Sequence, residues 1–285
     1  MIGPSTQKRF TLGHVTLNYR IDGTGPEPLV CIHGVGSSLL AWEGVVARLK
    51  NHFTLLTFDL RGHGESTRVQ GRYEIDDMVA ETLALASEAG FPRFHLAGFS
   101  LGGLIAQRLA LLAPERVNKL VLLSTVSGRN QQERDRVAAR LVALQAGEPG
   151  SHYDMSLSRW LTEAFQQNNP QLVMQLRERN AMNDPACYAA AYRVLAETDF
   201  GEQLHQVRCP TLIATGEEDA GSNPRMAAFM HQQIAGSQLR ILPGLRHSIL
   251  TEAPGLVATM LLEFLQSTDE RSSLSAEPSQ TRGQA

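Results

Sequence analysis

The segment 98–102, with the sequence GFSLG, places a serine between two glycines. The apolar run Phe94–Phe99 predicts a strand that ends just before Ser100, and Leu101–Leu112 predicts a helix that begins just after it. A serine on such a tight turn has a strained backbone and projects its hydroxyl clear of both elements. Glycines on either side prevent collisions with the neighbouring strand and helix. The segment therefore predicts that Ser100 is a nucleophile.

A serine hydroxyl is a poor nucleophile at its own pKa and needs a base that a third group orients. His247 lies in the loop that directly follows the predicted strand Gln238–Leu242. Catalytic groups in parallel sheets gather where the strands end at their carboxyl edge. His231, in contrast, falls inside the helix predicted before this strand. We therefore expect His247 to be the general base.

The acid that orients the base is expected in the loop after the predicted strand Thr211–Thr215. Three carboxylates follow the glycine of this loop: Glu217, Glu218 and Asp219. Asp219 is favoured because the glycine turn and two further residues place it at the top of the loop. The loop after the predicted strand Val117–Leu123 is an alternative origin, but its first acid is Glu133, well into the next segment.

Two backbone amides are expected to hold the oxyanion of a tetrahedral intermediate. One is the N–H of Leu101, which follows the nucleophile at the amino end of a helix, where negative charge is favoured. The second is expected from the loop His33–Ser38, whose glycines let the backbone approach a substrate. The N–H of Val35 is the predicted donor. His33 precedes the nucleophile and is interpreted as a brace of this loop.

Short apolar strands alternate with longer helical patterns, which predicts a mostly parallel sheet with helices on both faces. This alternation stops after residue 125 and resumes at residue 207. We expect a core made of residues 1–125 and 207–267, a helical insertion over 126–206, and a polar, disordered tail over 268–285. Helices of the insertion are predicted over these ranges: Arg134–Gln145, Ser156–Gln166 and Pro185–Glu197.

Composition excludes several classes of protein. The 285 residues are 42% apolar and 19% charged, with a net charge of -3 and no basic stripe of the kind that binds nucleic acid. No apolar run approaches the ~18–20 residues of a membrane span, and the first twelve residues show no signal peptide. The three cysteines, Cys31, Cys187 and Cys209, lack metal-ligand spacing and suit a reducing compartment. We expect a cytoplasmic protein that binds a small-molecule substrate and uses no metal or other cofactor.

Taken together, these segments resemble the α/β-hydrolase superfamily over about residues 10–266. The segments that carry the resemblance are His33-Gly34, Asp59–Ser66 (DLRGHGES), the Ser100 turn, Gly216–Asp219 (GEED) and the His247 loop. The resemblance implies an α/β-hydrolase fold with the chain order serine, acid, histidine, and an insertion that covers the pocket as a cap. It also implies that Asp59–Ser66 is a structural turn, so that Arg61 and His63 are scaffold.

Within the insertion, residues 159–165 (RWLTEAF) are similar to a stretch in 3-oxoadipate enol-lactonases, which usually have proline at the position of Glu163. The resemblance implies hydrolysis of a small carboxylic ester or lactone through an acyl-enzyme. Carbon–carbon bond hydrolases and cofactor-free perhydrolases share the triad and are alternatives, as is a ligand-sensing receptor. Epoxide hydrolases and haloalkane dehalogenases of this fold have aspartate where Ser100 stands, which argues against them.

We expect three side chains to line the substrate pocket: Trp42, Arg159 and Trp160. The insertion carries eight arginines: Arg129, Arg134, Arg136, Arg140, Arg159, Arg177, Arg179 and Arg193. Most are interpreted as solvated. Arg159, beside Trp160 in the enol-lactonase-like stretch, is predicted to hold a carboxylate at the far end of the substrate, because a guanidinium pairs bidentately with a carboxylate.

Overall fold

One mixed sheet forms the centre of the molecule. The computed structural model describes residues 7–146 and 151–267, and its eight strands follow the order β1-β2-β4-β3-β5-β6-β7-β8. The strands are β1 (Lys8–Leu12), β2 (Val15–Asp22), β3 (Glu27–Ile32), β4 (Phe53–Phe58), β5 (Phe94–Phe99), β6 (Val117–Leu123), β7 (Thr211–Gly216) and β8 (Gln238–Leu242). The pairs β1·β2 and β2·β4 are antiparallel, and the other pairs are parallel. The mostly parallel sheet expected from the sequence is confirmed, with β1 as an unpredicted edge strand.

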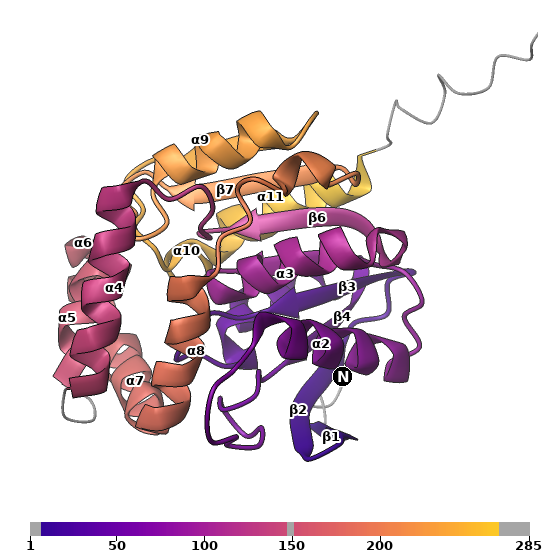
Figure 1. Ribbon diagram of the computed structural model, residues 1–285. Coiled ribbons are helices and arrows are strands. Elements are labelled where there is room, and N and C mark those ends of the chain that lie inside the picture. The colour runs from indigo at the N-terminus through magenta and orange to yellow at the C-terminus, as the bar shows by residue number, and fades with distance from the viewer. Residues whose placement is uncertain (1–6, 147–150, 268–285) are drawn as a thin grey trace, which may run out of the picture.

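Helices cover both faces of this sheet (Figure 1). One face packs against α2 (Ile75–Glu88), α3 (Leu101–Leu112) and α9 (Pro224–Gln233), and the other against α1 (Glu43–Leu49), α10 (Ile249–Glu252) and α11 (Pro254–Gln266). The central strands β3, β5 and β6 are almost wholly buried. Their continuous apolar runs follow from this double cover, because neither face of these strands meets water.

In the described part of the chain, five α-helices lie between β6 and β7 and form the predicted helical cap. They are α4 (Gln131–Ala146), α5 (Ser151–Trp160), α6 (Glu163–Asn168), α7 (Pro170–Ala181) and α8 (Pro185–Glu197). Figure 1 shows them grouped beside the sheet, in magenta to orange. The single helix predicted over 156–166 is in fact α5 and α6, because the Thr162 hydroxyl accepts the Phe165 N–H at 3.2 Å and starts a new helix.

Helix α7 was not predicted, and its composition explains why. Val173 is its one buried side chain in the structure, so its sequence carries little apolar periodicity. The predicted disordered tail lies outside the described residues. Among the described helices, none has the length and apolar character needed to cross a membrane.

Candidate active site

Ser100 occupies the sharp turn that the sequence predicted between β5 and α3. Its backbone has φ 55° and ψ -115°, a region that side-chain-bearing residues rarely adopt. A methyl group added at Gly98 would overlap the backbone of Gly102, and one added at Gly102 would overlap the Ile32 carbonyl oxygen. The strained turn is held because Ser100 donates its N–H to the Leu123 carbonyl at 3.0 Å. Both glycines are therefore required by close backbone contacts.

Asp219 and His247 meet at the carboxyl edge of the sheet. The His247 Nδ1 lies 2.7 Å from Asp219 Oδ2, and the carboxylate is almost completely buried. Its other oxygen accepts the backbone N–H groups of Gly221 and Ser222, each at 2.9 Å. Burial alone would raise the pKa of Asp219, but the attraction and hydrogen bond of His247, together with these N–H groups, lower it below its ordinary value.

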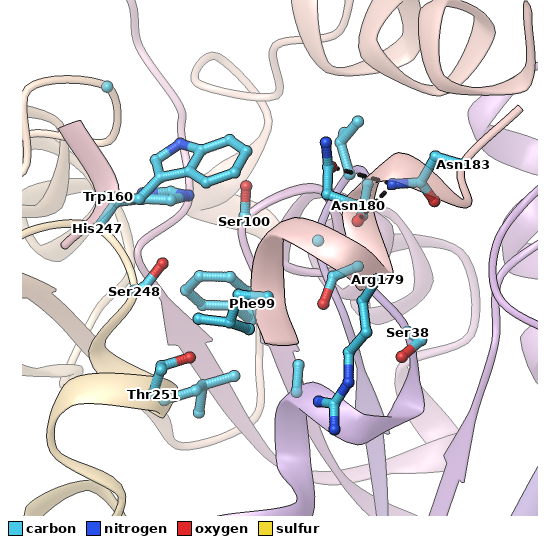
Figure 2. A pocket seen from close by; sticks show the side chains of 18 of the residues that line it. Ser38, Phe99, Ser100, Trp160, Arg179, Asn180, Asn183, His247, Ser248 and Thr251 are labelled. Atoms are coloured by element: carbon cyan, nitrogen blue, oxygen red, sulfur yellow. Dashed lines mark hydrogen bonds between the residues drawn. The ribbon is translucent and has the colours of Figure 1, made fainter. Parts of the chain in front are cut away.

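The histidine and the serine face the same pocket. Ser100, His247 and Trp160 all line this pocket, and in the view of Figure 2 the Ser100 hydroxyl lies to the right of the His247 and Trp160 side chains. The His247 ring also contacts Phe99, with 5.1 Å between ring centroids. The cap fixes the histidine loop directly, since the Ser248 N–H donates to the Trp160 carbonyl at 2.9 Å. The structure thus pairs the predicted acid with the predicted base, and the predicted nucleophile lines the same pocket as both.

The competing carboxylates have other partners. Glu217 is exposed and accepts the Gly244 N–H at 3.1 Å, and exposed Glu218 pairs with Arg246 at 3.4 Å. Glu133 is bound by Arg225. Their placement favours Asp219 as the partner of His247.

The loop after β3 lies against the nucleophile. A Cβ added at Gly34 would lie 2.9 Å from the Ser100 Cβ, so only glycine gives this close approach without a shift. His33 braces the loop, because its Nε2 accepts the Leu60 N–H at 3.0 Å and its Nδ1 lies 2.7 Å from the Gly34 carbonyl. That carbonyl shares a peptide group with the Val35 N–H. His33 therefore holds the peptide group of the predicted donor Val35, and Leu101, the second predicted donor, is the first residue of α3.

Two histidines of the core are scaffold. Burial lowers the pKa of His33 to about 4, while burial and the neighbouring His33 lower that of His63 to about 3. Their rings pack edge to face, with centroids 5.2 Å apart. Arg61 is likewise engaged, with its guanidinium 2.8 Å from the buried Glu81 carboxylate. These contacts agree with the interpretation of the 59–66 segment as a structural turn.

The pocket in front of Ser100 has a volume of about 930 Å³ and is walled by both the core loops and the cap. Arg159 and Trp160 line it, as expected from the sequence. The prediction for Trp42 is wrong. Its indole is fully buried in the apolar cluster between the sheet and α1 and α11, while its neighbours Ala41 and Glu43 line the pocket. A large apolar ring at this helical turn is more stable on the face that packs on the sheet.

The cap wall contains a pair of arginines that the sequence did not single out as a pair. Arg140 donates to the Ser156 hydroxyl at 2.7 Å, and Arg159 approaches the same oxygen at 3.1 Å. Burial and the charge of Arg140 lower the pKa of Arg159. Among the residues whose side chains the structure describes, 7–144 and 156–267, no carboxylate forms a salt bridge with either guanidinium. No sequence motif marks this pair, because the two residues lie on different helices.

The chain is similar to known hydrolases over most of its length. 3-Oxoadipate enol-lactonase 2 of Acinetobacter baylyi is 29% identical over 234 residues, which cover 82% of this chain and 87% of that protein. The (E)-2-((N-methylformamido)methylene)succinate hydrolase of the same organism is 28% identical over 257 residues, or 89% and 95% of the two chains. The crystal structure of the enol-lactonase from Burkholderia xenovorans LB400 has the same fold, with a TM-score of 0.85 at 24% identity, covering 91% of this chain and 100% of that one.

A family-level match covers the whole site. Residues 27–254 match the family described as alpha/beta hydrolase fold. The matched range begins at β3, contains the Ser100 turn and the entire cap, and ends beyond the His247 loop. The sheet order, the strained serine turn and this match lead to one conclusion: the chain belongs to the alpha/beta hydrolase fold family.

Proposed function

We propose that the protein hydrolyses a small carboxylic ester or lactone through an acyl-enzyme formed on Ser100. The observation that carries this proposal is the 2.7 Å contact between His247 and the buried Asp219 in a pocket that the strained Ser100 turn also faces. A serine on such a turn, with a base oriented by a carboxylate, is the arrangement that acyl transfer requires.

The chemistry follows from the positions of these groups. His247 Nε2 accepts the Ser100 proton as Oγ attacks the substrate carbonyl carbon. The carbonyl oxygen becomes an oxyanion, held by the N–H groups of Val35 and Leu101. When the tetrahedral intermediate collapses, the carbon–oxygen bond to the leaving group breaks and His247 returns the proton to that oxygen. His247 then activates a water that releases the acid from Ser100.

Asp219 holds the imidazole in the tautomer that leaves Nε2 free as the base. Because the pKa of Asp219 lies below its ordinary value, the carboxylate is ionised at neutral pH and stabilises the imidazolium that forms during both steps. The two backbone N–H groups on its second oxygen keep it from rotating away from His247.

We also propose that the acyl or leaving group carries a carboxylate at its far end, held by Arg159 together with Arg140. The half-buried Arg140 and the exposed Arg159 direct their guanidinium groups to one serine hydroxyl and repel each other, and a substrate carboxylate would relieve that repulsion. The planar groups can each donate two hydrogen bonds to such a carboxylate. A relative that is named as a hydrolase of a substituted succinate is consistent with an acidic substrate.

A fluorophosphonate probe and a paired substrate panel test these proposals. The probe is expected to form one adduct per chain, located by peptide mass spectrometry on the peptide that contains Ser100. The panel pairs acidic lactones and esters with neutral counterparts of the same size, and repeated turnover with preference for the acidic member is expected. An adduct on another serine would reject the assigned nucleophile. Turnover of dienone-type substrates but of no ester or lactone would favour a carbon–carbon bond hydrolase, and binding without turnover would favour a sensor.

A further inference from the structure

The oxyanion loop, defined here as residues 34–38, contacts the cap as well as the core. The Asn183 side-chain amide, in the turn between α7 and α8, donates to the Gly36 carbonyl at 2.8 Å. In the view of Figure 2, Asn180 and Asn183 lie on the opposite side of Ser100 from His247 and Trp160. The cap therefore contacts the catalytic machinery from two sides, at the histidine loop and at the oxyanion loop.

Asn183 is itself rigidly placed. Its amide nitrogen lies 3.0 Å from the Asn180 Oδ1, and its backbone N–H donates to the Asn180 carbonyl at 3.1 Å. The next residue, Asp184, caps α8 by accepting the Cys187 N–H at 2.9 Å. The donor that reaches Gly36 is thus fixed by the end of one helix and the start of the next.

The oxyanion loop needs such a contact because its backbone at Gly36 is conformationally free. Gly36 has φ 71°, a conformation that glycine adopts freely, and a side chain there would overlap the Tyr188 ring. On the core side, His33 holds the Gly34 carbonyl, whose peptide group carries the Val35 N–H. Among the described residues, Asn183 is the hydrogen-bond partner found for the Gly36 carbonyl. The segment Val35-Gly36 therefore lies between two fixed peptide groups, that of residues 34–35, held by the core, and that of residues 36–37, held by the cap.

We infer that Asn183 is a positioning residue that aims the Val35 N–H at the oxyanion by holding the Gly36 carbonyl. This role rests on the proposed function, since it acts only on a reaction that develops an oxyanion at Ser100. A donor aimed in advance stabilises the transition state more than the ground state, so its loss lowers kcat more than it changes KM. Removing an oxyanion donor outright lowers kcat by about 10²–10³-fold, and misaiming one should do less.

The test compares two inhibitors that differ only in whether they form an oxyanion. An aryl trifluoromethyl ketone adds to Ser100 as a tetrahedral adduct, whereas the corresponding methyl ketone binds as the intact carbonyl. In Asn183→Ala, the inhibition constant of the trifluoromethyl ketone should rise by about 10-fold, in parallel with the fall in kcat/KM. That of the methyl ketone should stay within about two-fold. Asn183→Asp, whose carboxylate repels the Gly36 carbonyl, should show the same pattern with a larger loss.

The matched control is Asn169→Ala, which removes an Asn hydrogen bond of 3.0 Å to the Phe165 carbonyl that stays within the cap. It should leave both inhibition constants unchanged. An equal loss of affinity for both ketones in the Asn183 variants would overturn the positioning role and indicate a general change of pocket shape. The proposed function fails in a different way, namely if Ser100→Ala binds the trifluoromethyl ketone as tightly as the unaltered protein does.

Discussion

The turn around Ser100 and the cap wall around Arg159 face the same pocket but are held in place by different interactions. At the turn, the side chains are buried and the backbones of β5, α3 and β3 touch so closely that one methyl group at Gly98 or Gly102 would overlap them. The helix α8 packs apolar side chains on the core, but the cap wall around Arg159 is attached through polar contacts. The Glu252 carboxylate accepts the Thr162 hydroxyl at 2.6 Å, and the Arg246 guanidinium donates to the Leu161 carbonyl at 3.1 Å.

This difference separates the chemistry from the choice of substrate. Packed backbone fixes the proposed nucleophile and the proposed oxyanion amides, whose positions must be precise for catalysis of any substrate. The polar side chains of the cap wall contact the substrate in the pocket. Substitutions among them are expected to leave the core folded. Substitutions at the turn or the triad should therefore affect every substrate alike, whereas substitutions in the cap wall should affect one class of substrate.

Ser100→Ala is expected to have the largest effect. Without the attacking oxygen, only binding and the oxyanion donors remain, so kcat should fall by about 10⁵–10⁶-fold for acidic and neutral substrates equally. Steady-state kinetics with both substrates measures this. Ser124→Ala is the matched control, because Ser124 is also buried with a positive φ of 42°. Similar losses in the two variants would show that packing, not nucleophilicity, explains the effect.

Asp219→Asn should come next, with a loss of about 10⁴-fold in kcat at neutral pH, because the amide favours the wrong imidazole tautomer. The shape of the site is kept, so the thermal midpoint should change little. Glu217→Gln and Glu218→Gln, in the same loop, should each retain nearly full activity. A comparable loss of kcat in either control variant would show that the acid of this loop has been assigned to the wrong residue.

Arg159→Ala and Arg140→Ala test the prediction that substitutions in the cap wall affect one class of substrate. Each should lower kcat/KM for an acidic lactone by about 30- to 1,000-fold, which corresponds to ~2–4 kcal/mol for a partly desolvated ion pair. Neutral aryl esters should be hydrolysed almost as before. Because both guanidinium groups would bind one carboxylate, the double variant should lose less than the sum of the two single losses.

Arg193→Ala is the control for these variants, since Arg193 pairs with Glu197 at 3.7 Å and does not line the pocket. Equal losses on acidic and neutral substrates in Arg159→Ala would point to a packing role for Arg159. A preference of the unaltered protein for neutral substrates would reject the carboxylate subsite.

The smallest expected effect is on stability. Gly102→Ala forces a methyl group against the Ile32 carbonyl and should lower the free energy of unfolding by about 1–3 kcal/mol. Gly255→Ala, near the start of α11, meets only the Arg48 side chain at 3.5 Å and should be neutral or slightly stabilising, because alanine favours a helix. Urea unfolding compares the two. Equal midpoints would contradict the close packing of the turn.

Much of the fold and of the triad could be predicted because the signals are local. The alternation of apolar strands with helical patterns predicted the central sheet, and the glycines around Ser100 mark a turn whose geometry depends on its immediate neighbours. Asp219 and His247 each follow a strand directly. In a parallel sheet the strand ends converge on one edge, so their positions along the chain were enough to predict their proximity.

Whether a side chain of a loop, such as that around Trp42, or of a cap helix faces the pocket depends on the tertiary structure. Trp42 is an apolar aromatic next to pocket-lining residues, yet it packs on the sheet, because the orientation of one helical turn depends on elements far away in sequence. The hydrogen bonds from Arg140 to Ser156 and from Asn183 to Gly36 join residues that are 16 and 147 positions apart. Such contacts depend on how whole helices pack, and no short pattern encodes that packing. The sequence by itself thus determined the sheet and predicted the nucleophile, base and acid, and the packing of the cap determined what surrounds them.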